Sequence, residues 1–165
     1  METYRGKGTP FDPDMSPCRG QCQVPVGALQ GALAAEHAAV WAYGVVGAFV
    51  SDALDARLSQ AATAHRARRD ATERILIDAG APPVPPEPGY LTPEPVTDTA
   101  SALRLAITAE ADVAAAWRSV IERSPVDADL RGTALDAMTE AAVRATRWRS
   151  TAGAAPLTVP FPGAP

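Results

Sequence analysis

The amino-acid sequence predicts an all-α protein, a four-helix bundle made of two antiparallel helical hairpins. Four stretches repeat apolar residues at alternating steps of three and four, the spacing of a helix face packed against other helices. Capping residues stand near the ends of these stretches, and a Pro-rich segment at residues 81–96 divides them into two pairs. Two hairpins joined by one long connection follow from these three features.

The first predicted helix spans residues 24–48 and has a carboxylate in its core-facing row, which we call the seam. An ionised carboxylate away from water costs free energy unless it is paired, hydrogen-bonded or bound to metal. The partner of Glu36 is therefore the central question that this sequence poses. The seam comprises Leu29, Leu33, Glu36, Val40, Tyr43, Gly47 and Val50.

The second predicted helix follows Ser51 and Asp52, which offer N-cap chemistry, and ends before Gly80, which suits a C-terminal cap. Only a few residues separate it from the first helix, and so the two should form an antiparallel hairpin. Its seam comprises Leu54, Leu58, Ala61, His65, Arg68, Thr72, Ile75 and Ala79.

Residues 81–96 contain seven prolines and predict an extended crossover. Pro-rich chain extends at about 3.1 Å per residue, so this segment reaches roughly 50 Å. A helix of about 27 residues is roughly 40 Å long. The crossover can therefore run the length of the bundle and return the chain to its opposite end within one domain.

The third predicted helix spans residues 98–124 and the fourth spans residues 127–152. Asp98 can cap the third helix, Pro125 breaks it, and Gly153 ends the fourth. The third seam comprises Leu103, Ile107, Glu110, Ala114, Trp117 and Ile121. The fourth comprises Leu130, Ala134, Ala137, Ala141, Arg144 and Trp148.

The two halves of the chain resemble one another. Glu36 and Glu110 each occupy a seam position, and each precedes an aromatic residue, Tyr43 or Trp117, by seven positions. Two related hairpins joined by a long crossover have the connectivity of ferritin-like bundles. We therefore predict a ferritin-like bundle over residues 24–153, with a flexible tail at 1–23 and a Pro-rich tail at 154–165.

The composition limits the classes of function. The chain has 165 residues, of which 47% are hydrophobic, and a net charge of −4, which argues against nucleic acid as a partner. Glu36 and His37 interrupt the apolar run of the first helix, so it does not suit a membrane span. The first residues lack the apolar core of a signal peptide. We expect a cytoplasmic protein with no membrane partner.

Cys18 and Cys22 are the only cysteines. Without a third and fourth ligand nearby, a C-x3-C pair does not predict structural zinc. We expect two thiols in the N-terminal tail, with a local disulfide as the alternative.

The ionisable seam residues are the candidate site, because all lie near the middle of their helices. A bundle should bring them together, and two carboxylates then balance two guanidiniums, which leaves the histidine free to be neutral. His37 lies one residue off the seam and is expected at a helix boundary or interface. Trp41, Tyr43, Trp117 and Trp148 are expected in core or dimer contacts. The predicted network or pocket comprises Glu36, His65, Arg68, Arg69, Glu110 and Arg144.

The metal pattern of ferritin-like proteins is incomplete in this sequence. Such a site takes one Glu from each of two helices and an E-x-x-H motif from each of the other two. Glu36 and Glu110 fit the first requirement, but the second and fourth helices have no E-x-x-H and present arginines instead. A guanidinium repels a cation and cannot bind it as a ligand.

Several separated motifs resemble the uncharacterised actinobacterial family DUF4439, which is classed as ferritin-like. They are ALQGALAAEHAAVWAYGVVGA, AHRARRDA, YLTPEPV and AITAEADVAAAW, and the similarity covers residues 26–148. The resemblance implies a ferritin-like four-helix bundle, and it implies no activity.

We therefore expect a binding or interaction module without a di-metal site, without catalytic residues and without a cofactor, built around a buried Glu/Arg/His network. A structural salt-bridge core and a pocket for a small ligand remain open for that network. The alternative function is an iron- or manganese-dependent oxidoreductase or metal-binding protein. Its ligands would be Glu36, His65, Glu110 and Glu140.

A homodimer is expected as well, because the sequence leaves apolar residues off the seams. The predicted interface comprises Trp41, Phe49, Leu157, Val159 and Phe161.

Overall fold

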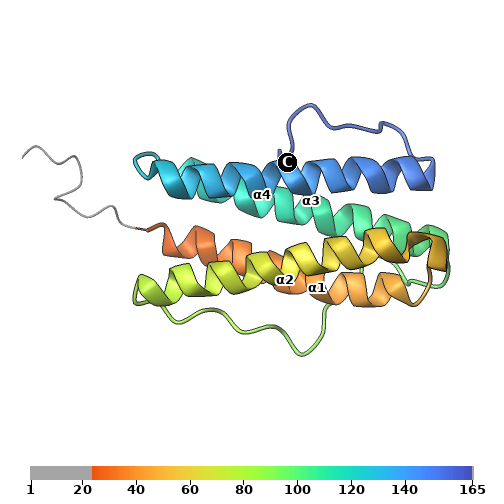
Figure 1. Ribbon diagram of the computed structural model, residues 1–165, viewed down its shortest axis with the longest axis horizontal. Helices are drawn as coiled ribbons and strands as arrows, with labels where there is room; N and C mark the ends of the chain where they lie inside the picture. The colour runs from red at the N-terminus through yellow and green to blue at the C-terminus, as the bar shows by residue number, and fades with distance from the viewer. Residues whose placement is uncertain (1–23, 165) are drawn as a thin grey trace, which may run out of the picture.

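The protein is an all-α four-helix bundle, which confirms the predicted fold class (Figure 1). The structure is a computed structural model that describes residues 24–164. Predictions about the N-terminal tail, including Cys18 and Cys22, lie outside these residues. Helices are α1 (Val26–Gly47), α2 (Asp55–Asp78), α3 (Thr99–Arg123) and α4 (Ala128–Ala152), with a short 3-10 helix η1 (Asp52–Leu54).

Local chemistry fixes most of the helix ends. Asp98 accepts a hydrogen bond from the Ser101 backbone N–H and forms a capping box with it, and Asp127 caps α4 in a similar way. Gly80 and Gly153 both have positive φ just after a helix, where glycine costs least. Ser51 differs from the expectation: it precedes η1 and makes no side-chain cap bond, and α2 begins only after that turn.

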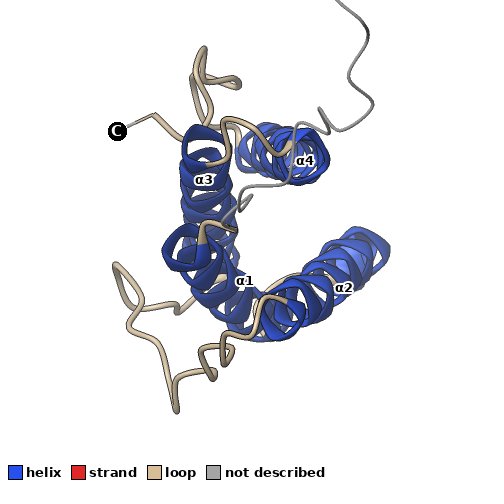
Figure 2. Ribbon diagram, turned by 90° about the vertical axis from the view of Figure 1, so that its left-hand side faces the viewer, coloured by secondary structure: helices blue, strands red, loops and turns tan. Residues whose placement is uncertain are grey.

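The helices pack unevenly around the bundle. α3 packs against both α1 and α4, and α1 packs against α2, whereas α2 and α4 have no comparable contact. Viewed along the helices, α2 and α4 diverge on the side away from α1 and α3 (Figure 2). One side of the bundle is therefore open.

The buried row of α4 matches the predicted seam except that Ala145 is buried where Arg144 was expected, and the buried surface of α1 is wider than its seam. Because α1 contacts two helices, it buries a second row of Ala32, Ala39 and Val46, while Val40 is only half-buried and Gly47 is exposed. α2 buries less of its surface than any other long helix, as expected for a helix with one close neighbour.

The connection from α2 to α3 follows α1 along its length (Figure 1). The Gln30 side chain bonds the backbone of residues 82 and 84, Trp41 packs on Tyr90 at 5.6 Å between ring centroids, and Thr99 bonds the Phe49 carbonyl. Trp41 is thus covered by this connection.

The C-terminal segment lies on the other side of the bundle, over α3 and α4 (Figure 1). Trp41 and the tail residues Leu157, Val159 and Phe161 therefore cannot form the single apolar surface that the sequence suggested. None of the described helices is long and apolar enough to cross a membrane.

Candidate functional site

Glu36 lies in the centre of the bundle with no exposed surface, and donors from two other helices face both of its oxygens. His65 Nδ1 on α2 lies 2.7 Å from Oε2, and Trp117 Nε1 on α3 donates to Oε1 at 2.8 Å. Arg68 Nε is 3.9 Å from the same Oε1. The partner of Glu36 is therefore mainly His65, and Arg144 does not reach it.

Glu110 is equally buried and collects three donors on a single oxygen. Its Oε1 accepts from the Tyr43 hydroxyl at 2.5 Å, from Arg144 Nε at 2.8 Å and faces His65 Nε2 at 3.2 Å. Its Oε2, and Arg144 Nη2 in the same ion pair, are buried without a hydrogen-bond partner among the described residues.

His65 bridges the two carboxylates through both ring nitrogens. A neutral imidazole donates from one nitrogen only, so donation to both acceptors requires the doubly protonated cation. Burial alone would lower the pKa of His65, but the hydrogen bonds and charges of Glu110 and Glu36 outweigh it and raise that pKa. The two contacts and the raised pKa therefore favour a protonated His65, which the sequence alone left free to be neutral.

A third acid restores the charge balance. Arg68 Nη2 donates to Glu140 Oε2 at 2.5 Å, and Arg144 Nη1 lies 3.6 Å from that oxygen. Counting each carboxylate as −1, the three acids then balance one imidazolium and two guanidiniums. We call Glu36, His65, Arg68, Glu110, Glu140 and Arg144 the buried cluster. A net charge of zero is what such a largely buried group of polar side chains needs.

Two aromatic residues, Tyr43 and Trp148, extend the hydrogen bonds of this cluster beyond Glu110. Burial, followed by the Glu110 charge, raises the pKa of Tyr43 far above its usual range, so its hydroxyl stays protonated and donates. That hydroxyl accepts a hydrogen bond from Trp148 Nε1 at 2.6 Å.

The ion pair with Glu110 keeps Arg144 charged. Burial alone would lower the pKa of Arg144, but the charge of Glu110 outweighs burial and raises that pKa.

The structure places the other predicted residues outside the cluster. Arg69 pairs with its neighbour Asp70 at 2.7 Å. His37 is buried beneath the α2–α3 connection, with Nε2 3.2 Å from the Val84 carbonyl and 3.8 Å from Glu73.

Sequence reasoning missed the polar roles of Tyr43, Trp117 and Trp148, which it assigned to packing. The signal was present in the repeated step of seven. Trp117 follows Glu110 on α3 but donates to Glu36, and Tyr43 follows Glu36 on α1 but donates to Glu110. Because the helices run antiparallel, each aromatic residue reaches the acid of the other helix.

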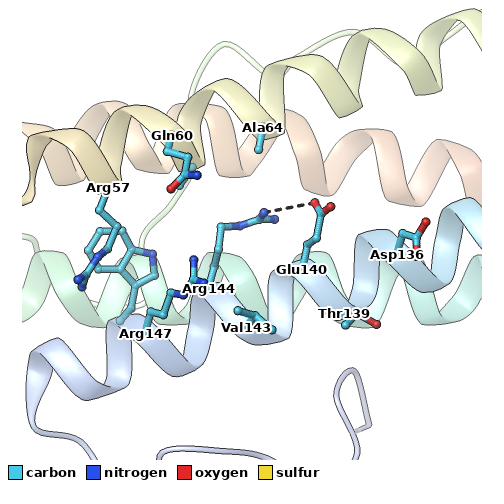
Figure 3. A pocket seen from close by; sticks show the side chains of 11 residues that line it. Arg57, Gln60, Ala64, Asp136, Thr139, Glu140, Val143, Arg144 and Arg147 are labelled. Atoms are coloured by element: carbon cyan, nitrogen blue, oxygen red, sulfur yellow. Dashed lines mark ion pairs between the residues drawn. The ribbon is translucent and has the colours of Figure 1, made fainter.

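A groove of about 430 Å³ lies between α2 and α4 above this cluster (Figure 3). Arg57 Nη1 donates to Thr151 at 2.6 Å across one end, and the Arg68–Glu140 pair spans the helices at the other. Between these contacts lie about three turns of α2, or roughly 16 Å. The lining residues are Arg57, Gln60, Ala61, Ala64, Asp136, Thr139, Glu140, Val143, Arg144, Arg147 and Trp148.

The carboxylates do not fit a di-metal centre of the ferritin-like kind. Both oxygens of Glu36 and one of Glu110 face N–H or O–H donors, and the Arg144 guanidinium lies 2.8 Å from Glu110. No group of three or more Asp, Glu, His or Cys side chains within residues 24–164 is arranged to hold a metal ion. A cation at Glu110 would have to displace Arg144.

Comparisons with known proteins give a family and a fold. The sequence profile of a family described as "Domain of unknown function (DUF4439)" matches residues 28–165. A crystal structure of rv2844 from Mycobacterium tuberculosis, described as a conserved hypothetical protein, is 40% identical in sequence with a TM-score of 0.74. The match covers 76% of this chain and 94% of that one. No curated protein matches the chain.

Proposed function

The chain belongs to the DUF4439 family, and from this premise we propose that it is a metal-free binding protein of the ferritin-like class. Its ligand is a small molecule held in the groove between α2 and α4. The proposal rests on one observation: the groove is bridged at both ends and lies directly over the buried cluster, with Arg144 belonging to both.

The size of the groove suits a small molecule. Ligand pockets commonly measure about 300–1,000 Å³ and combine apolar walls with a few polar groups. This groove has a volume of about 430 Å³ and mixes Ala61, Ala64 and Val143 with Gln60 and arginines. Four well-packed helices would leave no such space, and here α2 lacks a close partner on that side.

The buried cluster supports the groove. The carboxylates of Glu36 and Glu110 are held by donors from α1, α2, α3 and α4, which fixes how these helices meet. Locked side chains beneath a site keep its geometry constant. The cluster therefore serves as a rigid floor, with the chemistry of recognition above it.

The second candidate is the metal-dependent oxidoreductase, and one observation favours it. Glu110 Oε2 is buried and has no partner among the described residues, as a metal-binding oxygen would be before its ion arrives. The positive charge of Arg144 at the same carboxylate opposes a cation there. Glu140, the fourth predicted ligand, is engaged by Arg68.

Metal analysis separates the two candidates. Protein purified without chelator or affinity tag should hold only substoichiometric iron, manganese or zinc by plasma mass spectrometry. Stoichiometric iron or manganese that survives gel filtration would favour the oxidoreductase and overturn the metal-free part of the proposal.

Blocking the groove tests the binding part. Two fluorescent probes share one aromatic body: anionic anilinonaphthalene sulfonate and neutral phenylnaphthylamine. At least one probe should bind the parent, and neither should bind Ala64→Trp, because the larger side chain fills the groove. Ala67→Trp is the control, since position 67 is on an exposed part of α2, and this variant should bind as the parent does. Circular dichroism shows whether each variant is folded. If neither probe binds the parent, or if both variants bind alike, the groove is not the binding site.

A further inference from the structure

We propose that the ligand of this groove is an organic anion with an apolar body, and that Arg57 and Arg147 bind its negatively charged group. This inference rests on the proposed function and names the chemical class of the ligand. It follows from the distribution of charge and apolar surface along the groove.

The acidic residues of the groove do not neutralise its outer arginines. Glu140 is bonded to Arg68 and lies near Arg144, and Arg144 is tied to Glu110. These groups belong to the balanced cluster already described. Asp136 is left as the only other acid of the lining, against Arg57 and Arg147.

Arg57 and Arg147 lack acidic partners among the described residues. Arg57 donates to the neutral Thr151 hydroxyl and lies over the Trp148 ring at 5.7 Å, so its charge is not cancelled. The Arg147 guanidinium makes no hydrogen bond or ion pair among the described residues, while the Arg147 backbone carbonyl accepts a hydrogen bond from the Thr151 hydroxyl. Arg147 is one turn before Thr151 on α4, so both arginines lie at the same end of the groove.

Asp136 lies at the opposite end. Eleven residues separate it from Arg147 along α4, which corresponds to about 16 Å. That exceeds the Debye length of about 8 Å at physiological salt, so Asp136 contributes little at the arginine end. The groove is therefore positive at one end, and a guanidinium pair of this kind matches a carboxylate, sulfonate or phosphate group.

The surface between the two ends is partly apolar, beside the polar side chains of Gln60, Thr139, Glu140 and Arg144. Ala61 and Ala64 line it from α2, and Val143 and Trp148 line it from α4. An anion that consisted of a charged group alone would leave these side chains uncovered. A volume of about 430 Å³ admits a body the size of a small aromatic or aliphatic metabolite.

Charge discrimination tests the inference apart from the groove itself. The parent should bind anilinonaphthalene sulfonate about ten-fold more tightly than phenylnaphthylamine, a difference of about 1.4 kcal/mol. The double variant Arg57→Gln with Arg147→Gln should lose that preference while still binding the neutral probe. Arg66→Gln, an exposed arginine on α2 outside the groove, should keep it.

The outcomes distinguish the two proposals. If both probes bind with equal affinity, or if the double variant keeps the preference for the anion, the ligand class is wrong. In those cases the groove would still be the binding site, provided that Ala64→Trp blocks both probes. Raising the salt concentration should weaken sulfonate binding and leave the neutral probe unchanged, and equal salt dependence would also overturn the anion proposal.

Discussion

Glu36 and Glu110 are held by donors that come from different helices. Each receives a hydrogen bond from the aromatic residue of the opposite helix, and His65 joins the two carboxylates. Neutralising any one member leaves its partners buried with unbalanced charge.

Glu36→Gln should destabilise the protein by about 3–5 kcal/mol, the usual cost of removing one partner from a buried ion pair. The His65 imidazolium would keep only one carboxylate. Chemical denaturation should show a clearly lower midpoint. Because Arg144 pairs with Glu110, adding Arg144→Met should not restore stability.

The matched control for that change is Glu122→Gln. Glu122 forms an i,i+4 pair with Arg118 on the surface of α3, and exposed pairs contribute about 0–1 kcal/mol. If the Glu36→Gln and Glu122→Gln proteins have the same denaturation midpoint, the buried cluster is not a source of stability.

The pKa of His65 predicts how stability depends on pH. Folding raises this pKa above its ordinary value of 6.5, so the folded state holds the proton more tightly than the unfolded chain. The stabilisation is complete below about pH 6 and is lost as the pH rises through the folded-state pKa. The groups that face His65 are Glu36 and Tyr43 on α1 and Glu110 on α3. Arg68 on α2 and Arg144 on α4 lie against those two carboxylates.

Urea denaturation across neutral pH measures this effect. The free energy of unfolding of the parent should fall as the pH rises, and His65→Gln should remove that slope. His37→Gln should keep it, because His37 contacts the Val84 carbonyl and not the cluster. The same slope in His65→Gln as in the parent would mean that His65 does not carry the proton.

At the level of elements, the C-terminal segment is fixed to α3 by a close backbone contact. Gly163 has φ of 74°, and a Cβ at this position would lie 2.6 Å from the Ala114 carbonyl oxygen. The segment covers a cavity of about 880 Å³ over α3 and α4. Only glycine satisfies both the backbone angle and the contact.

Gly163→Ala should therefore release the end of this segment without unfolding the bundle. Hydrogen exchange of a peptide covering residues 158–164 should become faster, while peptides from α1–α4 stay as protected as in the parent. Gly132→Ala is the control, since a Cβ at Gly132 meets nothing within 4 Å. Unchanged exchange in Gly163→Ala would show that the contact does not hold the segment.

At the level of the whole molecule, we propose that the chain forms a homodimer, as its sequence suggests, through the exposed apolar residues of the C-terminal segment. Leu157, Val159 and Phe161 are 50%, 42% and 72% exposed, and clustered apolar surface often marks an interface. Trp41 no longer belongs to this surface, because Tyr90 covers it.

Light scattering after gel filtration tests this association. The parent should show a dimeric mass at high micromolar concentration, and Phe161→Ser should shift it toward the monomer. Leu91→Ser is the control, because Leu91 is exposed but lies in the α2–α3 connection on the other side of the bundle. A monomeric parent, or equal masses for both variants, would contradict the predicted interface.

Local sequence signals are enough to predict the four helices and most of their ends. Asp98, Asp127, Gly80 and Gly153 act on backbone groups within a few residues, so their effect can be inferred without knowing the rest of the fold. The burial of Glu36 and Glu110 was equally accessible, because helical periodicity alone puts both on a packed face.

Which groups meet across the bundle, and where the bundle stays open, depends on how the helices pack in three dimensions. Periodicity tells which side of a helix is buried, but not how far one helix is shifted or rotated against the next. Because of that offset, Glu36 contacts His65 and Trp117. Arg69 pairs with Asp70 outside the buried cluster, whereas Glu140 joins the cluster through Arg68. The same offset also separates α2 from α4, and the groove exists because that pair of helices does not close.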